Sequence, residues 1–346
     1  MISPLFSHLL IPFVIAMFLA ITMGGSGTAP AFSAAYGANV IKKSVIPGLF
    51  GIMVFLGAII AGKGTATTVG KNILAPEMMS LTVVSIILFS VAISLLIANI
   101  VGIPQSTSQS TVLSVSAVAL NFHALNTDKL FMEIIPTWFI LPVISFFISL
   151  FIGKYIYRPM RKKGYTLPRA QNENLKPIWD GVLVVMSLYV AFSIGANNVA
   201  NAAGPIATMT ANELQISGNE NFLLIMILST LIVAPSFGIG SSIFGHKILK
   251  NTGKEIVLFG KFEAVIIAFV SASLLLLASL TKGIPTSLVQ LNVASILGIG
   301  VAKLGGKNIF KKTQVKRFFI MWLIAPIIAF SLSLLFIFLA DRYGFI

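Results

Sequence analysis

Ten apolar runs, each long enough or nearly long enough to cross a bilayer of about 30 Å, constrain this chain more than any other feature. Runs of this length predict membrane-spanning helices. A soluble domain is excluded, because 57% of the 346 residues are hydrophobic and only 10% are charged, where roughly 25% charged is usual. We therefore predict an all-α polytopic membrane protein, with runs at about 5–23, 45–62, 78–100, 104–122, 133–157, 178–196, 222–245, 262–281, 285–302 and 318–340.

Two further stretches, 27–40 and 199–212, are too short to span and directly follow the first run of each half. We predict that they are half-helices or re-entrant segments, which gives about ten to twelve membrane segments in total. Gly195 and Pro205 disfavour an unbroken helix in the second half, and backbone groups freed at membrane depth are tolerated only around a ligand or cavity. The run 5–23 has no basic leading region or convincing cleavage site, so we expect it to be retained.

Basic residues set the orientation of these runs. The central linker, 158–177, is strongly basic, and the positive-inside rule places it in the cytoplasm of a multi-pass cell-membrane protein. Counting the spans outward from the linker then places the other basic loops in the cytoplasm as well, and both termini outside. The linker divides the chain into a first membrane repeat, 1–157, and a second, 178–346, and an odd number of spans in each gives the repeats opposite orientations.

The two halves resemble one another in sequence. Four pairs of segments keep chain order at offsets of 171 to 184 residues. Two oppositely oriented repeats with interrupted helices predict an alternating-access secondary transporter whose site lies near the membrane midplane. The pairs are Gly24–Gly27 with Gly195–Asn198, Val69–Ile73 with Thr252–Ile256, Gly102–Gln109 with Gly283–Gln290, and Trp138 with Trp322.

Neutral hydrogen-bonding side chains gather where such a site is expected. Helices that start after Pro104 and Pro285 leave their first N–H groups free, and the helix dipole favours a negative charge there. With nearby amides they form a donor-rich cage that suits a small inorganic anion. Alternatively, the hydroxyls cap their own helices and the amides join helices. The predicted substrate-binding residues are Asn197, Asn198, Asn201, Ser106, Thr107, Ser108, Gln109, Thr286, Ser287, Gln290, Ser26 and Thr28.

The segment Gly195-Ala196-Asn197-Asn198-Val199-Ala200-Asn201-Ala202 resembles the Gly-Ala-Asn-Asp-Val-Ala-Asn-Ala signature of the inorganic phosphate transporter (PiT) family. The two Gly-Ile-Pro segments resemble that family's repeated Pro-x-Ser-Thr-Thr element. The resemblance runs from the first helix to the last, and it implies an inverted-repeat fold and uptake of phosphate with Na⁺ or H⁺. Asn198 replaces the signature Asp, and the first repeat lacks the Asn-Asp pair, as in the family's bacterial sulfate permeases.

The missing carboxylates bear on the substrate. Phosphate near neutral pH carries a proton that a carboxylate can accept, whereas sulfate is fully ionised, only accepts hydrogen bonds and is repelled by a carboxylate. We therefore predict a sulfate symporter. If the family's Asp residues serve the coupling cation instead, the protein is a phosphate symporter. An anion channel is a remote alternative, since channels need charged rings or carbonyl filters.

Glu263 is the acid best placed to couple transport to H⁺ or Na⁺, because it lies near the start of the run 262–281. An ionisable residue at membrane depth is a functional hypothesis by default. The alternative is an interfacial Glu263 paired with Lys261 or Lys254.

Other function classes find no support in the residues. The chain has no cysteine and three scattered histidines, which predicts no metal site, no cofactor and no redox chemistry. No nucleophile stands beside a base, so we do not expect an enzyme. The net charge of +14 comes from short loops between apolar runs and implies no nucleic-acid partner. The expected partners are the anion and the lipid bilayer, and an oligomer stays open.

Overall fold

The computed structural model of the chain describes residues 4–101, 105–162, 176–216, 219–245, 260–311 and 313–346, and every regular element within these ranges is helical. The first half contains α1 (Pro4–Gly37), η1 (Lys43–Val45), α2 (Ile46–Ala61), α3 (Lys63–Thr67), η2 (Thr68–Asn72), η3 (Pro76–Met78), α4 (Leu81–Val101), α5 (Thr107–Asn121), η4 (Lys129–Ile134), α6 (Ile135–Phe151), η5 (Ile152–Tyr157) and α7 (Arg158–Lys162). The second half contains α8 (Lys176–Asn198), α9 (Ala200–Glu213), α10 (Asn219–Val233), α11 (Pro235–Gly240), η7 (Ser241–Gly245), α13 (Lys261–Thr281), α14 (Leu288–Leu304), α15 (Gly306–Phe310) and α16 (Thr313–Arg342).

All ten predicted apolar runs are helical, which confirms the all-α membrane class. Eight helical stretches in the described part of the chain are long and apolar enough to cross a bilayer. The runs 104–122 and 285–302 correspond to the shorter helices α5, of 15 residues, and α14, of 17 residues.

The first run does not end near residue 23, as predicted. Instead, α1 continues without a break through the stretch 27–40 as far as Gly37. The hydroxyl groups in the glycine-rich part are satisfied within the helix, since Ser26 donates to the carbonyl of Met23 at 3.0 Å and Thr28 to that of Gly24 at 2.7 Å. Pro30 lies inside the helix, which membrane helices tolerate. The predicted half-helix is therefore wrong here.

The second predicted half-helix is also nearly continuous with the run before it. Only Val199 separates α8 from α9, and its backbone angles remain helical. The carbonyl of Val199 accepts hydrogen bonds from the N–H groups of Ala202 and Ala203. Gly195 therefore does not break the helix, and Pro205 is accommodated inside α9.

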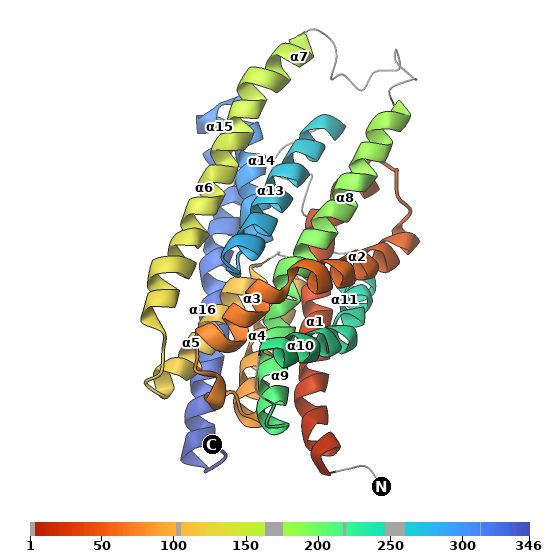
Figure 1. Cartoon of the computed structure of the whole chain (residues 1–346). Coiled ribbons are helices and arrows are strands. Elements are labelled where there is room, and N and C mark those ends of the chain that lie inside the picture. The colour runs from red at the N-terminus through yellow and green to blue at the C-terminus, as the bar shows by residue number, and fades with distance from the viewer. Residues whose placement is uncertain (1–3, 102–104, 163–175, 217–218, 246–259, 312) are drawn as a thin grey trace.

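The interruptions lie elsewhere, in two helical hairpins that the sequence analysis took for pairs of full spans. In Figure 1, α13 runs inward from the end that carries α7, and its connection to α14 lies about halfway along the bundle. The hairpin of α4 and α5 enters from the other end, where Thr82 on α4 bonds to the carbonyl of Phe345 near the C-terminus. Gly283, with φ of +59°, allows the turn into α14. The four runs thus meet in the interior.

Corresponding helices of the two halves run in opposite directions. In Figure 1, α1 and α6 run toward the end with α7, whereas α8 and α16 run away from it. The halves also exchange partners in the same way, because α2 packs against α8 while α11 packs against α1, and α6 packs against α14 while α16 packs against α5. These opposite directions and exchanged contacts fit an inverted repeat, and they pack the two halves tightly together.

Glycines permit the first of these exchanged contacts. A Cβ on Gly195 of α8 would stand 2.0 Å from the carbonyl oxygen of Val54, and one on Gly57 of α2 would stand 1.9 Å from that of Phe192. The same contact recurs between α1 and α11, where a Cβ on Gly24 would lie 2.2 Å from the carbonyl oxygen of Phe237. The glycine that opens the signature segment therefore lets two helix backbones touch.

We expect Gly195→Ala to destabilise the protein by about 1–3 kcal/mol, because the added methyl group forces the backbones of α2 and α8 apart. Gly181→Ala is the matched control on the same helix, since nothing lies within 4 Å of the Cβ that it would add. That change should be neutral or slightly stabilising. Thermal unfolding in detergent compares the two, and equal midpoints would contradict the close packing.

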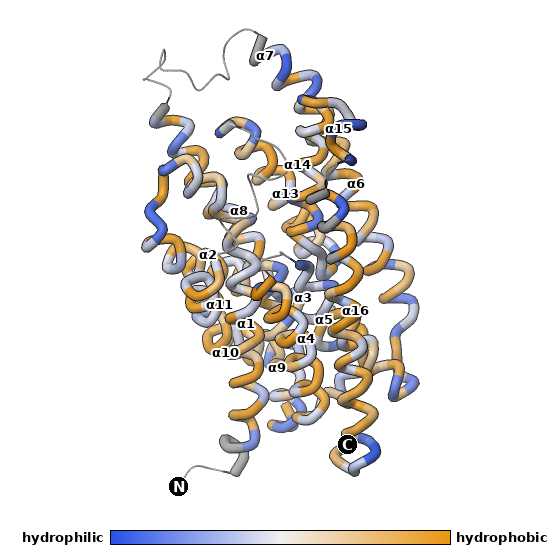
Figure 2. Tube along the Cα trace, turned by 180° about the vertical axis from the view of Figure 1, so that it is seen from behind, coloured by the Kyte–Doolittle hydropathy of each residue, from blue (hydrophilic) through white to orange (hydrophobic). Residues whose placement is uncertain are grey.

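The two ends of the bundle differ in what they carry. α1 begins and α16 ends at one end, opposite α7 and the start of α8 (Figure 1). Figure 2 shows apolar residues along the long helices and hydrophilic ones chiefly toward the two ends. This agrees with termini and linker on opposite sides of a membrane, and the side that each faces stays a prediction. The basic residues 163–175 and 246–259, including the repeat segment Thr252–Ile256, lie outside the described residues.

Candidate functional site

The starts of α5 and α14 meet in the interior, and each is capped in the same way. Ser106 accepts a hydrogen bond from the N–H of Gln109, and Ser287 from that of Gln290, both at 3.3 Å. The capping alternative is therefore confirmed for these two serines. A cap satisfies only one of the first N–H groups of a helix, so other N–H groups at each helix start have no partner within their own helix.

Gln109 and Gln290 join the two helix starts directly. The amide of Gln109 donates to Gln290 at 3.1 Å, and Gln290 donates back at 2.9 Å. These residues occupy corresponding positions in the two halves. Their reciprocal bonds are the pattern expected around a local two-fold axis. Both were predicted to bind the substrate, but neither lines the cavity described below.

All the hydrogen bonds that the Asn197 side chain makes are to other groups of the protein. Its amide nitrogen donates to Ser279 at 2.8 Å and to the carbonyl of Ile284 at 3.1 Å, while its oxygen accepts from Ser108 and from the N–H of Thr286, both at 3.1 Å. An asparagine side chain can make four such bonds, so none is left for an anion. Asn197 clamps α8 to both hairpins.

Asn201 extends the same network one turn further along the chain. Its amide nitrogen donates to the hydroxyl of Ser108 at 3.1 Å, which in turn donates to Asn197. Neither Asn201 nor Ser108 lines the cavity. The alternative that the amides join helices is thus realised by Asn197 and Asn201.

A small cavity lies between α1, the two helix starts and Asn198. It contains six of the predicted substrate-binding residues, and none of its lining residues is charged. Thr28 is not among them, and its hydroxyl donates to the carbonyl of Gly24 within α1. The lining residues are Ser26, Gly27, Pro30, Gln105, Ser106, Thr107, Asn198, Thr286, Ser287, Leu288 and Val289.

Two cavity-lining amides have unsatisfied atoms. Gln105 is 1% exposed, and neither its side-chain oxygen nor its nitrogen has a partner. The side-chain oxygen of Asn198, a residue 8% exposed, also has none. Because buried polar groups are almost always hydrogen-bonded, these atoms are suited to bind a ligand or water in the cavity. The sequence analysis did not assign Gln105 to the site, although it stands in the polar run after Pro104.

A second cavity adjoins the first and shares Pro30 with it. It lies between α1, α8, α13 and α14, and most of its lining is apolar. Its polar residues are Ser33, Ser187 and Asn292.

Glu263 lies at the start of α13, where it is 2% exposed. Its carboxylate accepts hydrogen bonds from Lys303 at 2.8 Å and from the N–H of Gly260 at 2.9 Å. Lys261, one of the partners considered above, pairs with Asp180 instead, and Lys254 lies outside the described residues. The role of Glu263 in ion coupling stays a prediction.

The sequence predicts no metal site. Among the residues that the structure describes, no three His, Asp or Glu side chains lie close enough together to hold a metal ion.

Known proteins resemble this chain over most of its length. The profile of the phosphate transporter family matches residues 23–333. A sulfate permease from Bacillus subtilis is 32% identical, over 95% of this chain and 88% of the relative. A probable low-affinity inorganic phosphate transporter from the same organism is 28% identical, over 90% of each chain. A solved sodium-dependent phosphate transporter has the same fold, with a TM-score of 0.81 at 22% identity, over 97% of this chain and 99% of that one. This chain is a membrane transport protein, not an enzyme, and belongs to the phosphate transporter family.

Proposed function

We propose that the protein is a cation-coupled sulfate symporter whose anion site is the cavity between the starts of α5 and α14. The observation that carries this proposal is the uncharged lining among the described residues, in which hydroxyls and amides at the starts of α5 and α14 surround one cavity. Such a set donates hydrogen bonds to an oxyanion, and the two helix dipoles favour its negative charge.

Sulfate is favoured over phosphate by the absence of a carboxylate from the described lining. Asn198, which lines the cavity, replaces the Asp of the family signature. A fully ionised anion needs donors only, whereas protonated phosphate also needs an acceptor for its hydrogen. The name of the 32% identical relative, a sulfate permease, supports the same choice.

Phosphate is the second candidate. The family description, the Bacillus subtilis relative and the solved structure all carry phosphate in their names. The unpaired side-chain oxygens of Gln105 and Asn198 could accept the hydrogen that phosphate carries.

For passage through the protein, we assign the second cavity to the route between the site and the end with α7. It adjoins the first cavity at Pro30 and involves the parts of α1, α8 and α13 nearest that end.

Competition in proteoliposomes tests the proposal. Uptake of labelled sulfate should saturate, should respond to a pH or Na⁺ gradient imposed separately, and should be inhibited by unlabelled sulfate more than by phosphate. Stronger inhibition by phosphate would favour the second candidate. Flux that neither saturates nor follows a gradient would point to the channel alternative.

Glu263→Gln tests coupling. If Glu263 carries the proton, this variant should lose accumulation driven by a pH gradient but keep anion exchange, which moves no net proton. Asp180→Asn is the matched control, because Asp180 also pairs with a lysine at a helix start without lining either cavity. Proton-driven uptake at the wild-type level in Glu263→Gln would assign the residue to capping α13.

A further inference from the structure

Two exposed lysines flank a tight contact in the middle of the protein. Lys63 starts α3 and Lys282 ends α13, and both are exposed. The glycines that follow them touch, because a Cβ on Gly283 would lie 2.4 Å from the carbonyl oxygen of Gly64. Neither lysine has an ion-pair partner within 4 Å among the described residues.

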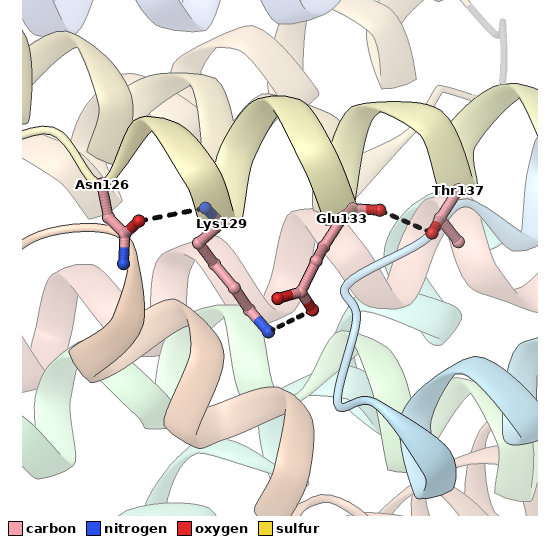
Figure 3. Close-up of polar contacts among 4 residues, drawn as sticks. All are labelled: Asn126, Lys129, Glu133 and Thr137. Carbon is pink, nitrogen blue, oxygen red and sulfur yellow. Dashed lines mark hydrogen bonds and ion pairs between the residues drawn. The ribbon is translucent and has the colours of Figure 1, made fainter.

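A third lysine lies beside the same turn. Lys129 on η4 pairs with Glu133 at 2.8 Å, and Figure 3 shows the turn between α13 and α14, in pale blue, passing next to Glu133. Lys282 interacts electrostatically with Glu133. Trp138, further along the same helix, fixes the turn by donating to the carbonyl of Pro285 at 2.9 Å. We call Lys63, Lys129 and Lys282, together with Glu133, the lysine cluster.

The position of the cluster requires water. Figure 1 places the start of α3 and the turn after α13 about midway between the two ends of the bundle. An exposed, unpaired lysine facing lipid at that depth is unfavourable, and charged side chains within membranes face the protein interior or a water-filled cavity. The hairpin of α13 and α14 enters from the end with α7, so its turn faces the opposite end. Water must therefore reach the cluster from the end that carries the termini.

The cluster also adjoins the anion site. Thr286, four residues after Lys282, lines the cavity, and its N–H is held by Asn197. On the basis of the function proposed above, we infer that the lysine cluster lines the aqueous entrance through which the anion reaches the site. Glu133 pairs with Lys129, so the four side chains of the lysine cluster have a formal net charge of +2. A positively charged entrance raises the local anion concentration and the rate at which the anion reaches the site, and salt screens this effect.

Cysteine labelling tests whether water reaches the cluster, independently of transport. The natural chain contains no cysteine, so a single introduced thiol is read without background. In intact cells, Lys282→Cys should react with a membrane-impermeant maleimide, and saturating sulfate should slow the reaction. Phe139→Cys is the matched control, because Phe139 lies on α6 near the cluster, 69% exposed on a face suited to lipid. Labelling of Lys282→Cys no faster than this control would overturn the entrance.

Transport kinetics test the role of the charge. Lys282→Gln and Lys63→Gln should each raise the KM for sulfate uptake by roughly threefold to tenfold at low salt, with the maximal rate unchanged and the difference lost at high salt. Lys43→Gln is the control and should leave KM unaltered. Lys43 lies in η1, before the start of α2, whereas Lys63 follows the end of α2. Restoring an ammonium group on Lys282→Cys with an aminoethyl thiol reagent should restore KM, whereas a sulfonate reagent should not.

The outcomes separate the two proposals. Wild-type KM in Lys282→Gln and Lys63→Gln, with normal uptake, would overturn the entrance and leave the sulfate site standing. A wild-type protein that transports neither sulfate nor phosphate would overturn the proposed function, while the labelling result would still report whether water reaches Lys282.

Discussion

Asn197→Ala should take up no measurable sulfate and should unfold at a clearly lower temperature than the wild type. The change removes four hydrogen bonds, and each buried partner on α5, on α13 and on the turn before α14 loses its bond to Asn197. Interhelical hydrogen bonds in membranes contribute roughly 0.6 to 1.7 kcal/mol each, so the loss of four is on the order of 2–7 kcal/mol. Because Asn197 holds the N–H of Thr286, both helix starts should also lose their positions around the cavity.

Thermal unfolding in detergent and sulfate uptake in proteoliposomes measure the two effects together. Asn99→Ala is the matched control, because Asn99 is a buried amide with one interhelical bond, to the carbonyl of Thr22, and does not line the cavity. Its loss should cost about 1 kcal/mol and leave uptake intact. An Asn197→Ala protein of wild-type stability that fails to bind sulfate would contradict the clamp and would place Asn197 on the anion.

Asn198→Asp should shift the preference of the site from sulfate toward phosphate by roughly tenfold or more. Asparagine can donate to a fully ionised oxyanion, whereas aspartate only accepts and repels it. The same carboxylate accepts the hydrogen of protonated phosphate. One charged hydrogen bond is worth about 1.5–3 kcal/mol, which sets the scale of the shift. The shift should grow toward lower pH, where more phosphate carries a second proton.

Competition between the two anions in proteoliposomes gives the ratio directly. Asn198→Ala serves as the control, since it removes the donor without adding a charge and should weaken both anions similarly. A wild type that already prefers phosphate, or an Asn198→Asp variant with an unmoved ratio, would mean that this position does not distinguish the proton on the anion. The sulfate assignment would then lose its physical basis.

Much of the architecture follows from local sequence. Apolar length alone located all ten helical runs, because a helix must be about 20 residues long to cross the bilayer. The repeated Gly-Ile-Pro segments located both capped helix starts, because proline and a following serine favour a helix N-terminus in any context. Gly195 marked a special backbone position, although it serves close packing against α2 rather than a break.

Three outcomes depended on contacts between distant segments. Neighbouring amides point in different directions around a helix, so the packing of both hairpins against α8 determined that Asn197 became a clamp and Asn198 a cavity wall. Gly24–Gly27 stays within the long helix α1, where α11 packs closely against Gly24. Lys63 and Lys282 stand 219 residues apart in the chain. No local pattern predicts their meeting, because it requires α3 and the turn after α13 to pack backbone against backbone.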